Sequence, residues 1–177
     1  MIIGIVGKLG QGKTLLATYL VYLMKKRNKN LKIYSNYNLN FKHQKISFND
    51  LLTYKENKEL DNAVIVLDEF HIFLDSRGSG ANKKNKIITY FITQTRKRNV
   101  ILIYTTQKLH MVDKRLRDLT DYLIKCEKID LGNNKFYIKF HILEDNDFNS
   151  IKTKLLTNPE KYFSLYDTKE IIDFTKQ

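Results

Sequence analysis

The sequence predicts an α/β fold, in which a largely parallel sheet is covered by helices on both faces. Continuous apolar runs of strand length alternate with helical segments along the 177 residues, and this alternation is typical of strands buried on both faces. A glycine-rich turn connects the first strand to the first helix. Toward the C-terminal end, two strand-like runs flank a Gly-Asn-Asn turn and predict a β-hairpin. We expect a single domain over residues 1–177.

The individual elements follow from apolar periodicity and turn residues. In the first half we expect a strand at 2–6, a helix from about Lys13 to 24, a strand at 31–37, a short helix at 47–54 capped by Ser47 or Asn49, and a strand at 62–69. In the second half we expect a loop at 75–86, a helix at 87–98, a strand at 99–107, a short helix at 113–121, strands at 122–129 and 135–142, a helix at 147–156 and an extended segment at 162–168.

The turn after the first predicted strand contains the pattern G-x-x-x-x-G-K-[ST], formed by Gly7, Gly12, Lys13 and Thr14. Glycines permit positive φ and let backbone N–H groups turn toward a phosphate, and the following helix directs the positive end of its dipole there. The lysine of this pattern reaches the β- and γ-phosphates of ATP, and the hydroxyl ligates Mg²⁺. A turn that only joins strand to helix is the alternative, but the complete match in this context favours a phosphate loop. The residues expected to contact the nucleotide are Gly7, Gly10, Gln11, Gly12, Lys13, Thr14 and Leu15.

Polar residues end two other predicted strands. Asp68 and Glu69 end the run VIVLDE, and Gln107 ends IYTTQ; the carboxyl ends of parallel strands form the ligand-binding edge of such sheets. We expect Asp68 to hold Mg²⁺ through water and Glu69 to orient and deprotonate an attacking water. The Gln107 amide can hydrogen-bond the γ-phosphate or that water. Without the phosphate loop upstream, a solvated turn or a helix cap would be the simpler reading of the acidic pair.

The chain is strongly basic, with 31 Lys and Arg against 19 Asp and Glu and a formal net charge of +12. This charge indicates a polyanionic partner, although a Lys-, Asn- and Ile-rich composition also follows from AT-rich coding sequence. Clustering at 25–32, 83–86 and 96–98 favours the partner.

Composition also excludes several classes of protein. A single cysteine, Cys126, excludes an internal disulfide framework. No apolar run approaches the roughly 20 residues of a membrane helix, and a cleaved signal peptide would remove the phosphate loop. We therefore expect a soluble, intracellular protein. The four histidines lack metal-ligand spacing, so Mg²⁺ is the only metal expected.

These segments resemble the FtsK–HerA superfamily of P-loop motor ATPases, with a RecA-like sheet. Within it they resemble the Zot-like assembly ATPases of filamentous phages and the genome-packaging ATPases of double-stranded DNA viruses. The resemblance rests on GKLGQGKT (7–14), DEFHIFLDSR (68–77), TQTRKRNVILIYTTQ (93–107), VDKRLRDLTDYL (112–123) and YFSLYDTKEI (162–171). It covers most of the chain apart from 38–60 and 127–160. The phosphate loop is specific only to P-loop NTPases, and the glutamine strand with its neighbours narrows the family.

The resemblance implies a homo-oligomeric ring, a hexamer or pentamer, with ATP between subunits and double-stranded DNA through the middle. A neighbour's arginine then completes each site; Arg117 is the first candidate and Arg115 the second, while Arg96, Arg98 and Arg77 are further options. The residues expected to contact DNA phosphates, independent of sequence, are Arg77, Lys83, Lys84 and Lys86. A capsid vertex protein is a further partner, and the implied location is the cytoplasm of an infected host cell and, transiently, the assembling virion.

Two departures from the phage Zot proteins favour a packaging motor over a membrane-anchored extrusion factor: no membrane segment follows the ATPase core, and no large second domain is present. A filamentous-phage-type virion assembly ATPase is the alternative. Two other classes remain open, a small nucleotide kinase and an ATP-gated DNA-binding protein with negligible hydrolysis. Asp68, Glu69 and Gln107 suit attack by water better than phosphate transfer to a nucleotide, and the intact Glu69 argues against a protein with negligible hydrolysis.

Overall fold

The computed structural model describes residues 1–47, 50–51, 53, 60–74, 89–133, 135–144 and 150–170. In this part of the chain the strands are β1 (Ile2–Val6), β2 (Lys32–Ser35), β3 (Gln44–Lys45), β4 (Ala63–Leu67), β5 (Ile101–Thr106), β6 (Tyr122–Gly132), β7 (Lys135–Glu144) and β8 (Ser150–Leu156). The helices are α1 (Lys13–Arg27) and α4 (Lys114–Asp118), with 3-10 turns η2 (Phe70–Leu74), η3 (Leu109–Met111) and η4 (Pro159–Leu165). Residues 89–94 are also helical.

The described strands form one sheet in the order β3-β2-β4-β5-β1-β6-β7-β8. Every pairing from β3 to β6 is parallel, whereas β6, β7 and β8 pair antiparallel. The predicted α/β fold, with a largely parallel sheet and a C-terminal hairpin, is therefore confirmed. Because β5 lies between β1 and β4, the strand before Gln107 separates the strand of the phosphate loop from the strand of Asp68 and Glu69.

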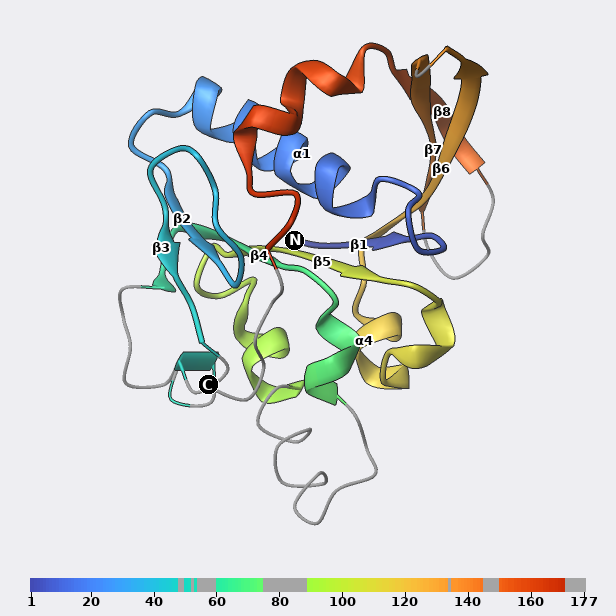
Figure 1. Ribbon diagram of the computed structural model, residues 1–177. Coiled ribbons are helices and arrows are strands. Elements are labelled where there is room, and N and C mark those ends of the chain that lie inside the picture. Colours follow the sequence, from blue (N-terminus) through green and yellow to red (C-terminus); the bar gives the residue numbers. More distant parts are fainter. Residues whose placement is uncertain are drawn as a thin grey trace.

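Helices and turns cover both faces of the sheet (Figure 1), and each face carries its own apolar core. On one face, α1 and η4 pack over the strands, and Leu16 and Val21 of α1 are fully buried there. On the other face lie η2, the helical residues 89–94 and α4, which bury Phe70, Phe91 and Leu116. Burial on both faces explains why β4 is a continuous apolar run instead of an alternating one.

The last third of the chain corrects two predictions. The helix expected at 147–156 is wrong: Ser150–Leu156 is strand β8, paired antiparallel with β7. The run has no regular alternation, because Lys152, Thr153 and Lys154 are consecutive polar residues, so its pairing with β7 decides its conformation. The extended segment at 162–168 is wrong over 162–165, where η4 continues from Pro159. Proline fixes φ near the helical value and so favours the first position of such a turn.

The segment after β2 packs against the C-terminal segment. Leu39 forms an isolated bridge with Tyr166, and the Asn40 backbone N–H donates to the Leu165 carbonyl. Of the helix expected at 47–54, Asp50 and Leu51 are helical, and Ser47 exchanges hydrogen bonds with Asp50 as a helix cap does. The remainder of that helix and the loop at 75–86 lie outside the described residues.

Candidate nucleotide-binding site

The phosphate loop joins β1 to α1 in a conformation that requires its glycines. Gly10 and Gly12 have φ of 75° and 83°, in the left-handed region that side chains disfavour. Gly12 precedes the first residue of α1 and has no side-chain cap, so the first N–H groups of the helix point into the loop. Gly7 is constrained differently, because a Cβ there would lie 2.6 Å from the Cys126 carbonyl oxygen.

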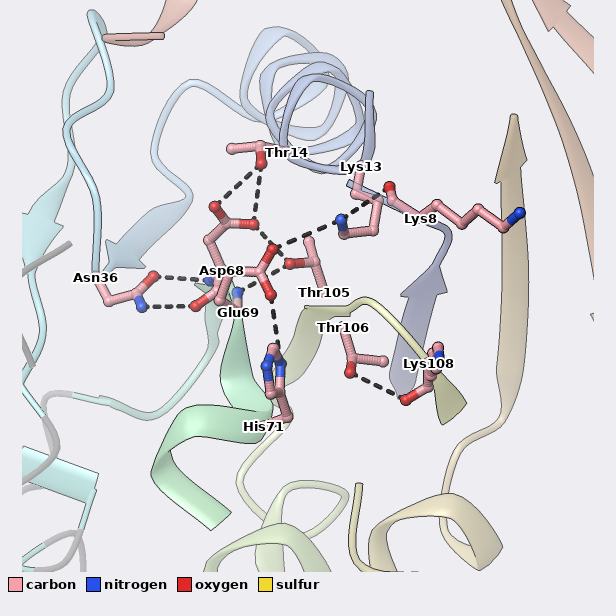
Figure 2. A network of polar contacts seen from close by, with 10 residues as sticks. All are labelled: Lys8, Lys13, Thr14, Asn36, Asp68, Glu69, His71, Thr105, Thr106 and Lys108. Carbon is pink, nitrogen blue, oxygen red and sulfur yellow. Dashed lines mark hydrogen bonds and ion pairs between the residues drawn. The ribbon is translucent and has the colours of Figure 1, made fainter. Parts of the chain in front are cut away.

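Lys13 lies at the centre of the site and is only 5% exposed. Its ammonium donates to the Lys8 carbonyl at 3.3 Å and lies 3.5 Å from Glu69 Oε1 (Figure 2). A buried cation is stable only with such partners. The ammonium is therefore held at the mouth of the loop, beside the acidic strand end.

Asp68 is buried beneath the first turn of α1. Thr14 Oγ1 donates to both of its carboxylate oxygens at 3.0 Å, and Thr105 Oγ1 donates to Oδ1 at 2.5 Å. Burial raises the pKa of the Asp68 carboxyl above its usual range, and the two threonine hydrogen bonds oppose that shift. A hydroxyl and a carboxylate in contact form the oxygen donor set that Mg²⁺ prefers, so Thr14 and Asp68 fit the metal of Mg·ATP.

Two residues that support Asp68 were missed by the sequence analysis. The Asn36 side chain accepts from the Asp68 backbone N–H at 2.8 Å and donates to its carbonyl at 3.0 Å. Thr105 Oγ1 also accepts from the Glu69 backbone N–H at 2.9 Å. Asn36 follows β2 directly and Thr105 lies near the end of β5, so the rule that located Asp68 at a strand end would have located both.

Glu69 occupies a strained position between Lys13 and His71. Its φ is 48°, which is uncommon for a residue with a side chain. Oε1 faces Lys13, while Oε2 lies 3.3 Å from Nδ1 of His71. Within the described residues, neither Glu69 Oε2 nor His71 Nδ1 makes a hydrogen bond. A buried carboxylate oxygen without a donor is costly. His71 was not predicted, and it lies where it can orient Glu69 (Figure 2).

Gln11 links the loop to the hairpin. Its side-chain oxygen accepts from the Lys128 backbone N–H at 2.7 Å, and its own carbonyl accepts from the Cys126 thiol at 3.0 Å. Burial raises the pKa of the Cys126 thiol to about 12, so this cysteine stays protonated and packs in the core. The Gln11 side chain thus holds β6 beside the phosphate loop.

A pocket of about 740 Å³ opens above these groups. Its phosphate end is lined by Gly10, Gly12, Lys13, Thr14, Leu15 and Glu69. Its far end is lined by the tip of the β6–β7 hairpin and by residues of η4 and the segment after it. The volume lies within the range typical of small-ligand sites.

The remaining predicted residues lie elsewhere. Gln107 follows β5 directly and is half-buried at the same sheet edge as Asp68. Arg115, exposed, and Arg117, half-buried near Tyr104, belong to α4, and neither lines the pocket within the described residues. Arg96 pairs with Asp121 at 2.5 Å, and Arg98 pairs with Asp61. Arg77, Lys83, Lys84 and Lys86 lie outside the described residues.

None of the helices in the described part of the chain is long and apolar enough to cross a membrane. The chain is 33% identical over 158 residues to the uncharacterized protein ORF2 of Spiroplasma virus SpV1-R8A2 B, covering 83% of this chain and 45% of that protein. It is 30% identical over 167 residues to ORF2 of Spiroplasma virus SpV1-C74, covering 85% of this chain and 48% of that protein. The chain thus spans about half the length of these curated relatives.

Solved structures share the fold. The N-terminal domain of zonular occludens toxin from Neisseria meningitidis superposes with a TM-score of 0.70 at 18% identity, covering 94% of this chain and 98% of that one. The genome packaging NTPase B204 from Sulfolobus turreted icosahedral virus 2, in complex with AMP, gives a TM-score of 0.60 at 16% identity, covering 87% and 95%. The model of the ATPase family associated with various cellular activities (AAA) matches residues 3–128. The chain therefore belongs to the AAA family of P-loop ATPases.

Proposed function

We propose that this chain is an ATP-hydrolysing motor of the FtsK–HerA type that translocates double-stranded DNA and packages viral DNA into a capsid. The observation that carries the hydrolytic part is that Lys13, Thr14 and Glu69 line one end of a single pocket, where Thr14 is hydrogen-bonded to the buried Asp68. The proposed partners are a capsid vertex protein and other copies of the chain. The proposed location is the cytoplasm of the infected cell and, transiently, the assembling virion.

The geometry supports hydrolysis with Glu69 as the base. Thr14 and Asp68 would hold Mg²⁺, which would neutralise charge on the β- and γ-phosphates. The phosphates compete with Glu69 for the Lys13 ammonium, 3.5 Å away, so nucleotide binding draws the cation from the carboxylate. Glu69 then accepts a proton from a water whose oxygen bonds to the γ-phosphorus as the bond to the β–γ bridging oxygen breaks. ADP and phosphate leave.

The DNA part rests on charge and similarity. A net charge of +12 suits a polyanion, and B204 is itself described as a genome packaging NTPase. We propose that Arg77, Lys83, Lys84 and Lys86 contact DNA phosphates, and that Gln107 senses the γ-phosphate. In a ring, Arg117, or else Arg115, would stabilise the charge that develops in a neighbour's site. Among the described residues, no arginine lines the chain's own pocket.

The second candidate is a virion assembly ATPase of the filamentous-phage type. It is favoured by the zonular occludens toxin domain, whose TM-score of 0.70 exceeds the 0.60 of B204. A nucleotide kinase is the third, and it would transfer the γ-phosphate to a nucleoside or nucleotide instead of to water.

The test measures phosphate release with and without duplex DNA of random sequence, together with the mass of the protein in solution with and without ATP. We expect DNA to stimulate release, and we expect a ring. Arg117→Ala and Glu69→Gln should each be inactive, but mixing them should restore partial activity, because some interfaces then pair an intact Glu69 with an intact Arg117. No stimulation by DNA, or phosphate transfer to a nucleoside, would refute the motor. If the mixed subunits assemble together but remain inactive, only the proposed role of Arg117 is refuted, and the motor is not.

A further inference from the structure

We infer that Phe163 is the stacking platform for the base of the bound nucleotide and favours purines over pyrimidines. This inference rests on the proposed nucleotide function and assigns the far end of the same pocket to the base of the nucleotide. The phosphate end is fixed by Lys13 and Thr14, so the ribose and base must extend along the rest of the cavity. The described lining there comes from the hairpin and from residues 163–168.

Three aromatic side chains line this end: Tyr166 packs edge-on against Tyr37, and the other two, Phe136 and Phe163, form a pair. The rings of Phe136, on β7, and Phe163, in η4, are stacked with centroids 6.1 Å apart and planes inclined by 25°. The Lys128 ammonium lies 4.4 Å from the centroid of the Phe136 ring. Phe163 is the outer member of the pair and is 40% exposed. A large aromatic ring presented to the pocket offers the π-surface on which a base stacks.

Residues other than Phe163 anchor η4 to the rest of the protein. The centroid of the neighbouring Tyr162 ring lies 4.6 Å from that of Tyr19 on α1, and Pro159 is buried at the start of the turn. The turn is thus anchored through other residues while Phe163 lines the cavity. A purine has a larger and more polarisable π-surface than a pyrimidine and therefore stacks more strongly, so the platform predicts an order of affinity of ATP and GTP above CTP and UTP.

A purely structural role for Phe163, closing the hairpin onto η4, makes a different prediction. Leucine would retain most of the apolar packing but none of the stacking. We therefore expect Phe163→Leu to unfold at nearly the wild-type temperature and yet to weaken ATP binding by roughly 5- to 150-fold, the range measured for removing a base-stacking aromatic residue. Binding of inorganic tripolyphosphate, which has no base, should be unchanged, and Phe163→Tyr should restore ATP affinity.

The sequence contains no tryptophan, which permits a direct readout. In Phe163→Trp the introduced indole would be the only one, and its fluorescence should be quenched by ATP and GTP but not by tripolyphosphate. The matched control is Phe41→Trp, because Phe41 likewise pairs with another aromatic ring, that of Tyr22 on α1, but does not line the pocket. Its fluorescence should not respond.

Each outcome decides between the proposals. If Phe163→Leu binds ATP as tightly as wild type does, and tripolyphosphate likewise, the platform is refuted but the proposed ATPase is not. The same holds if the fluorescence of Phe163→Trp does not change when ATP binds. If ATP binding falls only as much as tripolyphosphate binding, Phe163 supports the fold and the platform is again refuted. If neither ligand binds the wild-type protein, both proposals fail.

Discussion

The parallel and antiparallel parts of the sheet present different surfaces to the same pocket. At the ends of the parallel strands, polar groups are buried and held by hydrogen bonds: Asp68 is 7% exposed and Thr105 fully buried. At the antiparallel end, the pocket is bordered by exposed groups such as Phe163 and the hairpin tip. Preorganised, desolvated groups stabilise developing charge most strongly. Under the proposed function, the chemistry would therefore take place at the parallel strand ends, and the base would bind between η4 and the antiparallel hairpin.

The largest effect should come from removing the central cation of the parallel part. We expect Lys13→Ala to reduce ATP turnover below detection, because no other described ammonium lies at the phosphate end of the pocket. The matched control is Lys8→Ala, whose side chain is exposed and points away from the site (Figure 2), while its backbone carbonyl remains. Normal phosphate release by Lys13→Ala would overturn the assignment of the site.

The next effect separates binding from chemistry within the parallel part. Glu69→Gln keeps the shape of the side chain but loses its basicity, so phosphate release should fall by about 10²- to 10⁴-fold while ATP affinity is retained. Glu127→Gln, an exposed position on β6, serves as the control. A collapse of ATP affinity with a near-normal residual rate would make Glu69 a structural or metal-binding residue.

Two glycines of the loop test how closely the two parts of the sheet are joined. An alanine Cβ at position 7 would lie 2.6 Å from a backbone oxygen of β6, which cannot rotate away, whereas at Gly10 nothing lies within 4 Å. We expect Gly7→Ala to lower the free energy of unfolding by about 3 kcal/mol, as overpacking does. Gly10→Ala should cost about 1 kcal/mol through its positive φ alone. Urea unfolding measures both, and equal costs would show that β6 can withdraw from the loop.

The smallest effect concerns the cost of the buried acid. Because burial raises the pKa of Asp68, the folded protein binds that proton more tightly than the unfolded chain does, so this group adds stability as pH falls and removes it as pH rises through the raised pKa. Asp68→Asn should therefore stabilise the protein without nucleotide by about 0.5–2 kcal/mol. The gain should be larger at pH 8 than at about pH 5. A destabilised variant at both pH values would show that the threonine hydrogen bonds outweigh burial.

The sequence predicts the parallel part of the sheet better than the antiparallel part. The phosphate loop, the apolar strands β1, β4 and β5, and the acidic pair carry local signals, and the structure brings Lys13, Thr14, Asp68 and Glu69 together. Long-range packing carries no such signal. Strand β8 is defined by its pairing with β7, and η4 by its packing on α1. His71 could not be singled out, because the sequence signals neither the left-handed backbone of Glu69 nor the approach of the two side chains.

The hydrogen bond from the Lys128 backbone N–H to Gln11 has a thermodynamic consequence. It joins a residue of the phosphate loop to the middle of a long strand whose far end is the hairpin tip. Suppose that nucleotide binding changes the strength of this bond, and that a molecule bound to the hairpin does so too. Each ligand must then change the affinity of the other by the same factor, because linkage between two ligands is reciprocal. A neighbouring subunit or a capsid component seated on the hairpin would thus report nucleotide occupancy without touching the nucleotide.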